Sequence, residues 1–235
     1  ERVNLDIAQK KLAAEVKEKI QQLDIESDGK GWQAKVFLYC VEVICPESGW
    51  LVPLIPSLII SKGYRVVAKL IPDERNKRYE INICYVKSDE EVSMAEVGTV
   101  QDGYLVHSLD GQNEYRISIK SIRGDFKEGK QNKNRLRMWD KSDFIPRSGD
   151  IFQERLYCIQ WMRQKPESKK FEYEFRSVSS DDLIREQKVI DYVRIHLEEW
   201  QAQGYVPDMV IEAGAKTDEP IRTRGWTHWH HLFNP

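Results

Sequence analysis

The end of the chain gathers histidine, tryptophan and arginine side chains that could do chemistry. These residues are Arg222, Arg224, Trp226, His228, Trp229, His230 and His231. Histidine nitrogens can bind a transition metal, but a His-x-His pair needs a carboxylate or a further ligand to make a site. Arginines can instead neutralise phosphates, and tryptophan or histidine rings can stack on an extruded base. A third interpretation is that the tryptophans dock this tail onto the core, since large aromatic rings are usually buried.

A second candidate region is the polar segment 124–149, where basic residues outnumber acidic ones. Phosphate contacts need only charge and reach, so a mobile basic loop or linker would suffice, with Trp139 as an inserted aromatic ring. The alternative is a solvated loop without a ligand. The candidate nucleic-acid contacts here are Lys127, Lys130, Lys133, Arg135, Arg137 and Lys141.

The composition limits what such residues can mean. The 235 residues include 36 Lys and Arg against 38 Asp and Glu, so the net charge is −2 and any nucleic-acid footprint must be local. With 40% hydrophobic and 31% charged residues, the chain is not collagen, a disordered tail or a disulfide scaffold. The four cysteines form no Cys-x-x-Cys pair, which indicates reduced thiols and a cytoplasmic location. The apolar stretch 51–60 is too short to cross a bilayer, and the charged, helix-like residues 1–30 predict no signal peptide, so no membrane partner is expected.

The elements that must position these residues follow from hydrophobic periodicity. Apolar residues at steps of three or four predict a helix over 5–23 and a long helix near 180–203, which begins at a Ser179–Asp182 cap, buries Leu183 and Leu197, and stops at Gly204. Alternation predicts a strand over 37–43, and 51–60 fits an irregular edge strand or buried loop. Further strands are expected over 64–71, 77–86, 97–100, 104–107, 114–122, 156–162 and 170–178.

These elements predict an α+β fold with a mostly antiparallel sheet of short hairpins, flanked by the two helices. In the hairpin of 156–162 and 170–178, we expect aromatic side chains to lie opposite one another across the strands. The expected divisions are an N-terminal helix with a β region over 1–123, the basic loop over 124–149, and a hairpin, helix and Trp/His-rich tail over 150–235.

Three segments carry a resemblance to a known family. They are Cys45–Leu54 followed by Gly98-Thr99-Val100, then Asp150–Tyr157, and finally Arg224–Pro235. Together they resemble the large bacterial and archaeal adenine-specific DNA methylases that contain a zinc-ribbon insertion. The resemblance runs through most of the chain, and the last segment is its most specific part.

In that family this region lies between the S-adenosylmethionine-binding motif and the catalytic Asp-Pro-Pro-Tyr loop. The chain has no such loop, and Gly29-Lys30-Gly31 follows a helix rather than a strand, so no catalytic or cofactor residue is assigned here. The resemblance therefore implies an insertion region that contacts DNA, inactive alone, with S-adenosylmethionine bound by the complete enzyme. Its implied partners are DNA, the rest of the methyltransferase and other restriction or phage-defence proteins.

The zinc ribbon of the family maps onto two turns whose ligands are largely replaced. Ser48 stands at the second cysteine place of the first turn, and His107 and Asp110 stand at the cysteine places of the second. Structural zinc sites almost always have four good ligands, so zinc is not expected, with Cys45, His107 and Asp110 as weak candidates. This is the degenerate zinc-ribbon-like part of the predicted fold.

Two other functions stay open at this point. The chain could be an independent interaction module that docks a protein through the aromatic hairpin at 156–175. It could also be a metal-dependent hydrolase that uses His228, His230 and His231 as ligands.

Overall fold

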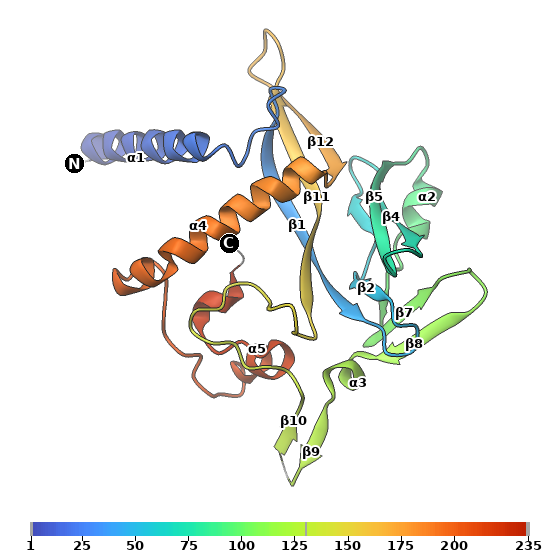
Figure 1. The fold of residues 1–235 in the computed structure, drawn as a ribbon. Coiled ribbons are helices and arrows are strands. Elements are labelled where there is room, and N and C mark those ends of the chain that lie inside the picture. The colour runs from blue at the N-terminus through green and yellow to red at the C-terminus, as the bar shows by residue number, and fades with distance from the viewer. Residues whose placement is uncertain (1, 130, 234–235) are drawn as a thin grey trace. The chain divides into compact units, whose positions relative to one another are not determined.

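The computed structural model describes residues 2–129 and 131–233 and shows an α+β protein whose sheets are mostly antiparallel (Figure 1). The chain divides into two compact units, one made of 1–38 and 158–194 and the other of 39–157 and 195–235. Three elements contribute residues to both units: β1 (Gln33–Ile44), β11 (Gln153–Gln164) and α4 (Ser180–Ala202). The division therefore does not follow the sequence boundaries expected near 123 and 149.

The first unit contains α1 (Arg2–Leu23), as its periodicity predicts, and the hairpin of β11 and β12 (Phe171–Ser177). In this hairpin Trp161 lies opposite Glu174, and Met162 lies opposite Tyr173. Residues directly opposite each other share a face of the sheet, so the expected aromatic pairs across the hairpin were wrong by one position of register. The ring of Trp161 is instead buried beneath the guanidinium groups of Arg176 and Arg185, whose carbons lie 5.4 and 5.6 Å from its centroid.

Helix α4 begins and ends as its sequence predicts. The backbone N–H of Ser179 donates to the carboxylate of Asp182 at 2.8 Å, and the backbone N–H of Asp182 donates to the Ser179 hydroxyl at 3.3 Å. Gly204 follows with φ of 75°, a left-handed conformation that favours glycine and ends a helix. Leu197 is buried as expected, but Leu183 is 49% exposed, so the predicted apolar stripe does not cover the first turn.

The second unit holds the sheet formed by β2 (Leu51–Leu54), β3 (Ile59–Ser61), β4 (Val66–Asp73) and β5 (Arg78–Tyr85) beside the end of β1. Strand β2 pairs with both β1 and β5, so the edge position expected for 51–60 is wrong for this strand. Pro53 has no N–H to donate, and the parallel pairing of β2 with β5 is confined to Leu51 and Arg78. The hairpin of β4 and β5 agrees with the sequence.

A smaller antiparallel sheet is formed by β6 (Val100–Gln101), β7 (Tyr104–Ser108) and β8 (Glu114–Ser118). The strand expected over 114–122 ends at Ser118, because the chain continues as the short helix α3 (Ile119–Arg123). The second unit also contains α2 (Asp89–Met94), the hairpin of β9 (Phe126–Glu128) and β10 (Gln131–Lys133), α5 (Asp218–Arg224) and a 3₁₀ turn, η1 (Trp229–Leu232).

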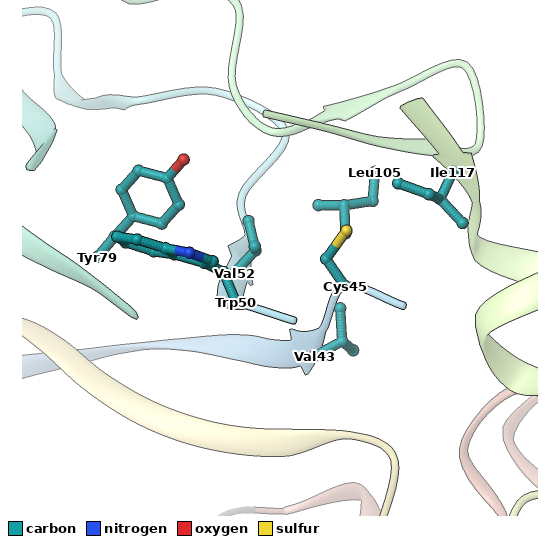
Figure 2. Close-up of a cluster of buried hydrophobic side chains, with 7 residues drawn as sticks. All are labelled: Val43, Cys45, Trp50, Val52, Tyr79, Leu105 and Ile117. Atoms are coloured by element: carbon teal, nitrogen blue, oxygen red, sulfur yellow. The ribbon is translucent and has the colours of Figure 1, made fainter. Parts of the chain in front are cut away.

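A buried cluster anchors the chain where β1 turns into β2 (Figure 2). Its members are Val43, Cys45, Trp50, Val52, Tyr79, Leu105 and Ile117. The Trp50 and Tyr79 rings lie 5.7 Å apart, and Cys45 and Val52 are completely buried. This packing holds the 45–50 turn against the β6–β8 sheet. Among the described residues, the helices are too short or too polar to cross a bilayer.

Candidate nucleic-acid interface

The second unit brings distant basic residues together at the end of α3. Gly124 closes α3 with φ of 67°, and the backbone N–H of Arg135 donates to the carbonyl oxygen of Arg123 at 2.9 Å. A Cβ atom at Gly124 would lie only 2.8 Å from Cδ of Arg135, so glycine lets the returning chain pass closely. The Asn134 amide donates to the carbonyl oxygen of Arg222 at 2.5 Å. These bonds join α3, the base of the β9–β10 hairpin and the end of α5.

We name the resulting set of side chains the basic cluster. Its members are Lys120, Arg123, Lys127, Lys133, Arg135 and Arg222. Arg123 forms a two-point ion pair with Asp125, at 3.1 and 2.7 Å, and Lys133 pairs with Glu128. The hydrogen bond from Arg123 lowers the pKa of Asp125, and the positive charges of Arg222 and Lys120 lower it further.

Four exposed members of the basic cluster make no ion pair or side-chain hydrogen bond with the described residues: Lys120, Lys127, Arg135 and Arg222. Two of them, Lys120 and Arg222, still lie close enough to Asp125 for their charges to lower its pKa. The sequence predicted Lys127, Arg135 and Arg222 as contacts. It did not predict Lys120, which lies within the strand expected over 114–122, or Arg123, which directly follows that strand. The helical spacing of Lys120 and Arg123 before Gly124 is the signal that could have found them.

Other predicted contacts are engaged within the protein. The Arg137 guanidinium donates to both carboxylate oxygens of Asp150 at 2.7 Å and to Asp143 at 2.5 Å, and these hydrogen bonds raise its pKa. Arg147 donates to the same Asp143 at 2.8 Å, and Lys141 pairs with Asp208 at 2.7 Å. Arg137 and Lys141 are therefore less suited to phosphate than their sequence suggests.

Segment 137–150 also differs from a featureless loop. Trp139 is buried, with its ring edge-on to Trp226 at 6.2 Å and to His231 at 5.1 Å. The expectation that Trp139 is an inserted aromatic ring is therefore wrong, because this ring has little surface left to offer. Trp226 and Trp229 are half-buried. Lys130, another predicted contact, lies outside the described residues.

Two of the three terminal histidines bond to the backbone of this segment. His230 and His231 donate from Nε2 to the carbonyl oxygens of Asp143 and Asp140, both at 3.1 Å. Nδ1 of His231 accepts from the backbone N–H groups of Thr227 and His228. Burial is the main cause that lowers the pKa of His231 to about 4, so the ring is neutral at pH 7.

The third histidine, His228, is half-buried and bonds to its neighbour Thr227. The Thr227 hydroxyl donates to the carbonyl oxygen of Trp139 at 2.5 Å, so it accepts the Nδ1–H of His228 at 2.8 Å. Burial is also the main cause that lowers the pKa of His228. His230 and His231 thus fasten the tail to segment 139–143, and Thr227, which bonds to His228, adds a bond to Trp139. This arrangement gives no support to a hydrolase with three histidine ligands.

The two turns that resemble zinc knuckles lie side by side and are joined by hydrogen bonds. Tyr79 donates its hydroxyl proton to the carbonyl oxygen of Ser108 at 2.9 Å, so its oxygen accepts the Nδ1–H of His107 at 3.0 Å. Nε2 of His107 then accepts from the Ser48 hydroxyl at 3.2 Å. The Ser48 backbone N–H points at the sulfur of Cys45, 3.5 Å away. Burial lowers the pKa of His107, which keeps this ring neutral.

Asp110, the other weak zinc candidate, is used by its own turn. Its carboxylate accepts from the backbone N–H groups of Asn113 and Gln112 at 2.8 and 2.9 Å, and these bonds, with the one from Asn113 first, lower its pKa to about 2. In the described part of the chain, no group of three or more His, Cys, Asp or Glu side chains is arranged to hold a metal ion.

Comparison of the chain with protein-family models, with curated proteins and with solved structures yields no match.

Proposed function

We propose that this chain contacts the backbone of DNA through the basic cluster, as the DNA-contacting region of an adenine-specific DNA methyltransferase. In this proposal the chain has no methyl-transfer activity of its own, and flanking parts of the enzyme bind S-adenosylmethionine. Its partners are DNA and those flanking parts.

The observation that carries the proposal is that the exposed side chains of Lys127, Arg135 and Arg222 form no ion pair with the described residues. The chain as a whole is slightly acidic, so its net charge does not attract a polyanion such as DNA. Exposed cations that lack an internal carboxylate partner are available to phosphates, and their binding releases counterions from DNA. Phosphate contacts position a protein on DNA without reading its sequence, so no target sequence follows from them.

The methyltransferase part of the proposal is supported by the resemblance of segments 45–54, 150–157 and 224–235. Segment 224–235 begins at the end of α5 beside the basic cluster. Segment 150–157 includes Asp150, which holds Arg137. A methylase that acts on the exocyclic nitrogen of adenine must take the base out of the duplex, so it needs surfaces that hold the distorted backbone.

A gel-shift series at increasing salt tests DNA binding. A double-stranded oligonucleotide is titrated with the wild type and with the triple variant Lys127→Ala, Arg135→Ala, Arg222→Ala. We expect the wild-type affinity to fall steeply with salt, and the triple variant to lose about 0.9 in the log–log slope for each phosphate contact removed.

The matched control removes three exposed lysines from the turn between β11 and β12: Lys165, Lys169 and Lys170, each replaced by alanine. This variant changes the net charge by the same amount, so it should keep the wild-type slope. Equal slopes for the wild type and the triple variant of the basic cluster would refute the interface. Salt-insensitive capture of a protein partner, without DNA binding, would favour the interaction module instead.

A further inference from the structure

One half-buried arginine next to the basic cluster forms no ion pair with the described residues. Arg224, the last residue of α5, lines a narrow cleft whose walls include Phe152, Trp226, Leu136 and Glu154. Its guanidinium carbon lies 5.4 Å from the centroid of the Phe152 ring and 5.8 Å from that of Trp226. Within the described part of the chain, its side chain makes no hydrogen bond or ion pair.

A second arginine in the same cleft, Arg137, differs from Arg224 because its charge is balanced by two carboxylates. Arg137 also lines the cleft, and its donors are taken up by Asp150 and Asp143. Burial is the main cause that lowers the pKa of Arg224; the negative charge of Glu154 raises this pKa, and the positive charge of Arg123 lowers it. A charge removed from water without a partner is costly, so an anion in the cleft would repay that cost.

The rings also prepare Arg224 for a particular kind of ligand. A guanidinium held over two aromatic faces keeps its plane and its fork of N–H donors, which match two oxygens of one phosphate or carboxylate. Arg123, which pairs with Asp125, lies close enough to Arg224 for its charge to lower the pKa of Arg224, so its positive charge also attracts an anion at this place. Glu154 would repel a doubly charged group, so a singly charged phosphate fits better.

We propose that Arg224 binds one singly charged phosphate group in this cleft, either a phosphodiester of DNA or free dihydrogen phosphate. The phosphodiester source rests on the proposed function. In that case Arg224 is a contact supported by two aromatic rings, beside the exposed side chains of Lys127, Arg135 and Arg222.

Thermal unfolding with inorganic phosphate at pH 6 tests the site directly, since a ligand that binds the folded state raises the midpoint. Phosphate should raise the midpoint of the wild type above that in sodium acetate or chloride of equal ionic strength. Arg224→Gln should lose this rise, and Arg224→Lys, which keeps the charge but not the fork, should show a smaller one. Lys216→Gln, an exposed lysine just before α5, should behave as the wild type.

Two results would contradict binding of phosphate by Arg224. A rise in Arg224→Gln equal to that of the wild type would overturn the proposal, and so would an equal rise with acetate. Near-ultraviolet circular dichroism of the tryptophans checks that the variants fold; if Arg224→Gln does not, the comparison of Arg224→Lys with the wild type decides.

Titration of the oligonucleotide distinguishes the two phosphate sources. Loss of about 0.9 in the salt slope in Arg224→Gln would support the phosphodiester, while an unchanged slope would leave free phosphate as the ligand. If the basic-cluster variant fails to alter DNA binding but phosphate still stabilises the wild type, the proposed function is refuted and the phosphate site stands.

Discussion

Tyr79 is the residue that fixes the hydrogen-bond chain between the two knuckle-like turns. It accepts from His107 and donates to Ser108, so its single hydroxyl satisfies two polar groups in a buried place. Both bonds of this hydroxyl go to the second turn, and Nε2 of His107 then makes the bond to Ser48 of the first turn. The sequence shows the replaced zinc ligands but not these hydrogen bonds.

Tyr79→Phe is expected to destabilise the protein by about 1–3 kcal/mol, since it leaves buried polar groups without partners. Urea unfolding at pH 7.5 measures the change. Tyr115→Phe is the matched control: its ring stacks on His107 at 5.0 Å, and its hydroxyl makes no hydrogen bond with the described residues, so its loss should cost under about 0.5 kcal/mol. Equal effects of the two variants would contradict the assigned bonds.

The buried histidines predict how stability depends on pH. The pKa of His231 is about 4 in the folded protein against an ordinary value of 6.5, so the unfolded chain binds more protons between these values. Stability is therefore full above pH 6.5 and falls as the pH drops toward 4, and His228 and His107, whose pKa values are also lowered, act in the same direction.

Urea midpoints measured at pH 7.5, 6.0 and 5.0 test this dependence. His231→Gln should be less stable than the wild type at pH 7.5, because it loses the hydrogen bonds of the His231 ring. Its free energy of unfolding should then fall less between pH 7.5 and 5.0 than that of the wild type. A wild-type midpoint that stays constant from pH 7.5 to 5.0 would rule out a neutral buried His231.

At the scale of elements, segment 137–150 owes its shape to ions rather than to regular secondary structure. Arg137, Arg147, Asp143 and Asp150 form one connected network, in which both aspartates are largely buried. Removing one member of such a network strands the charges of the others, which costs more than the loss of an exposed pair.

Arg137→Met is accordingly expected to destabilise the protein by about 3 kcal/mol, measured by urea unfolding. Arg135→Met, at an exposed position two residues earlier, should change the free energy of unfolding by less than about 0.5 kcal/mol. If both variants were equally stable, the network would contribute nothing to the fold of this segment.

Helix α4 offers a second comparison within one element. Leu197→Ala should cost about 2–5 kcal/mol because this side chain is buried, whereas Leu183→Ala at the exposed first turn should cost under about 0.5 kcal/mol. The order of the two unfolding midpoints checks the result. A larger loss at Leu183 would mean that this turn is covered in solution.

At the scale of the whole molecule, the proposed function divides the work between this chain and its flanking parts. The chain has neither the glycine-rich strand-turn-helix nor the Pro-Pro loop that methyl transfer would need. We expect isothermal calorimetry to show no binding of S-adenosylmethionine to it, while DNA still binds. Saturable cofactor binding would contradict that division, and methylation of an oligonucleotide by the chain alone would end it.

The local elements could be predicted from the sequence, because periodicity, caps and turns depend on neighbouring residues. Helix α1, the β4–β5 hairpin and the Ser179–Asp182 cap all follow from residues a few positions apart. The sequence also placed a local excess of positive charge in 124–149 within a slightly acidic chain.

Which of those charges remain available to a ligand depends on contacts between distant segments, and these are seen in the fold alone. Arg137 and Arg135 look alike in sequence, but Arg137 meets Asp150 thirteen positions away and Arg135 meets no carboxylate among the described residues. Likewise, β2 became an interior strand and the aromatic hairpin took the other register, since pairing and burial are settled by side chains far apart along the chain. Ion pairing acts through space, and a single sequence does not record distance in space.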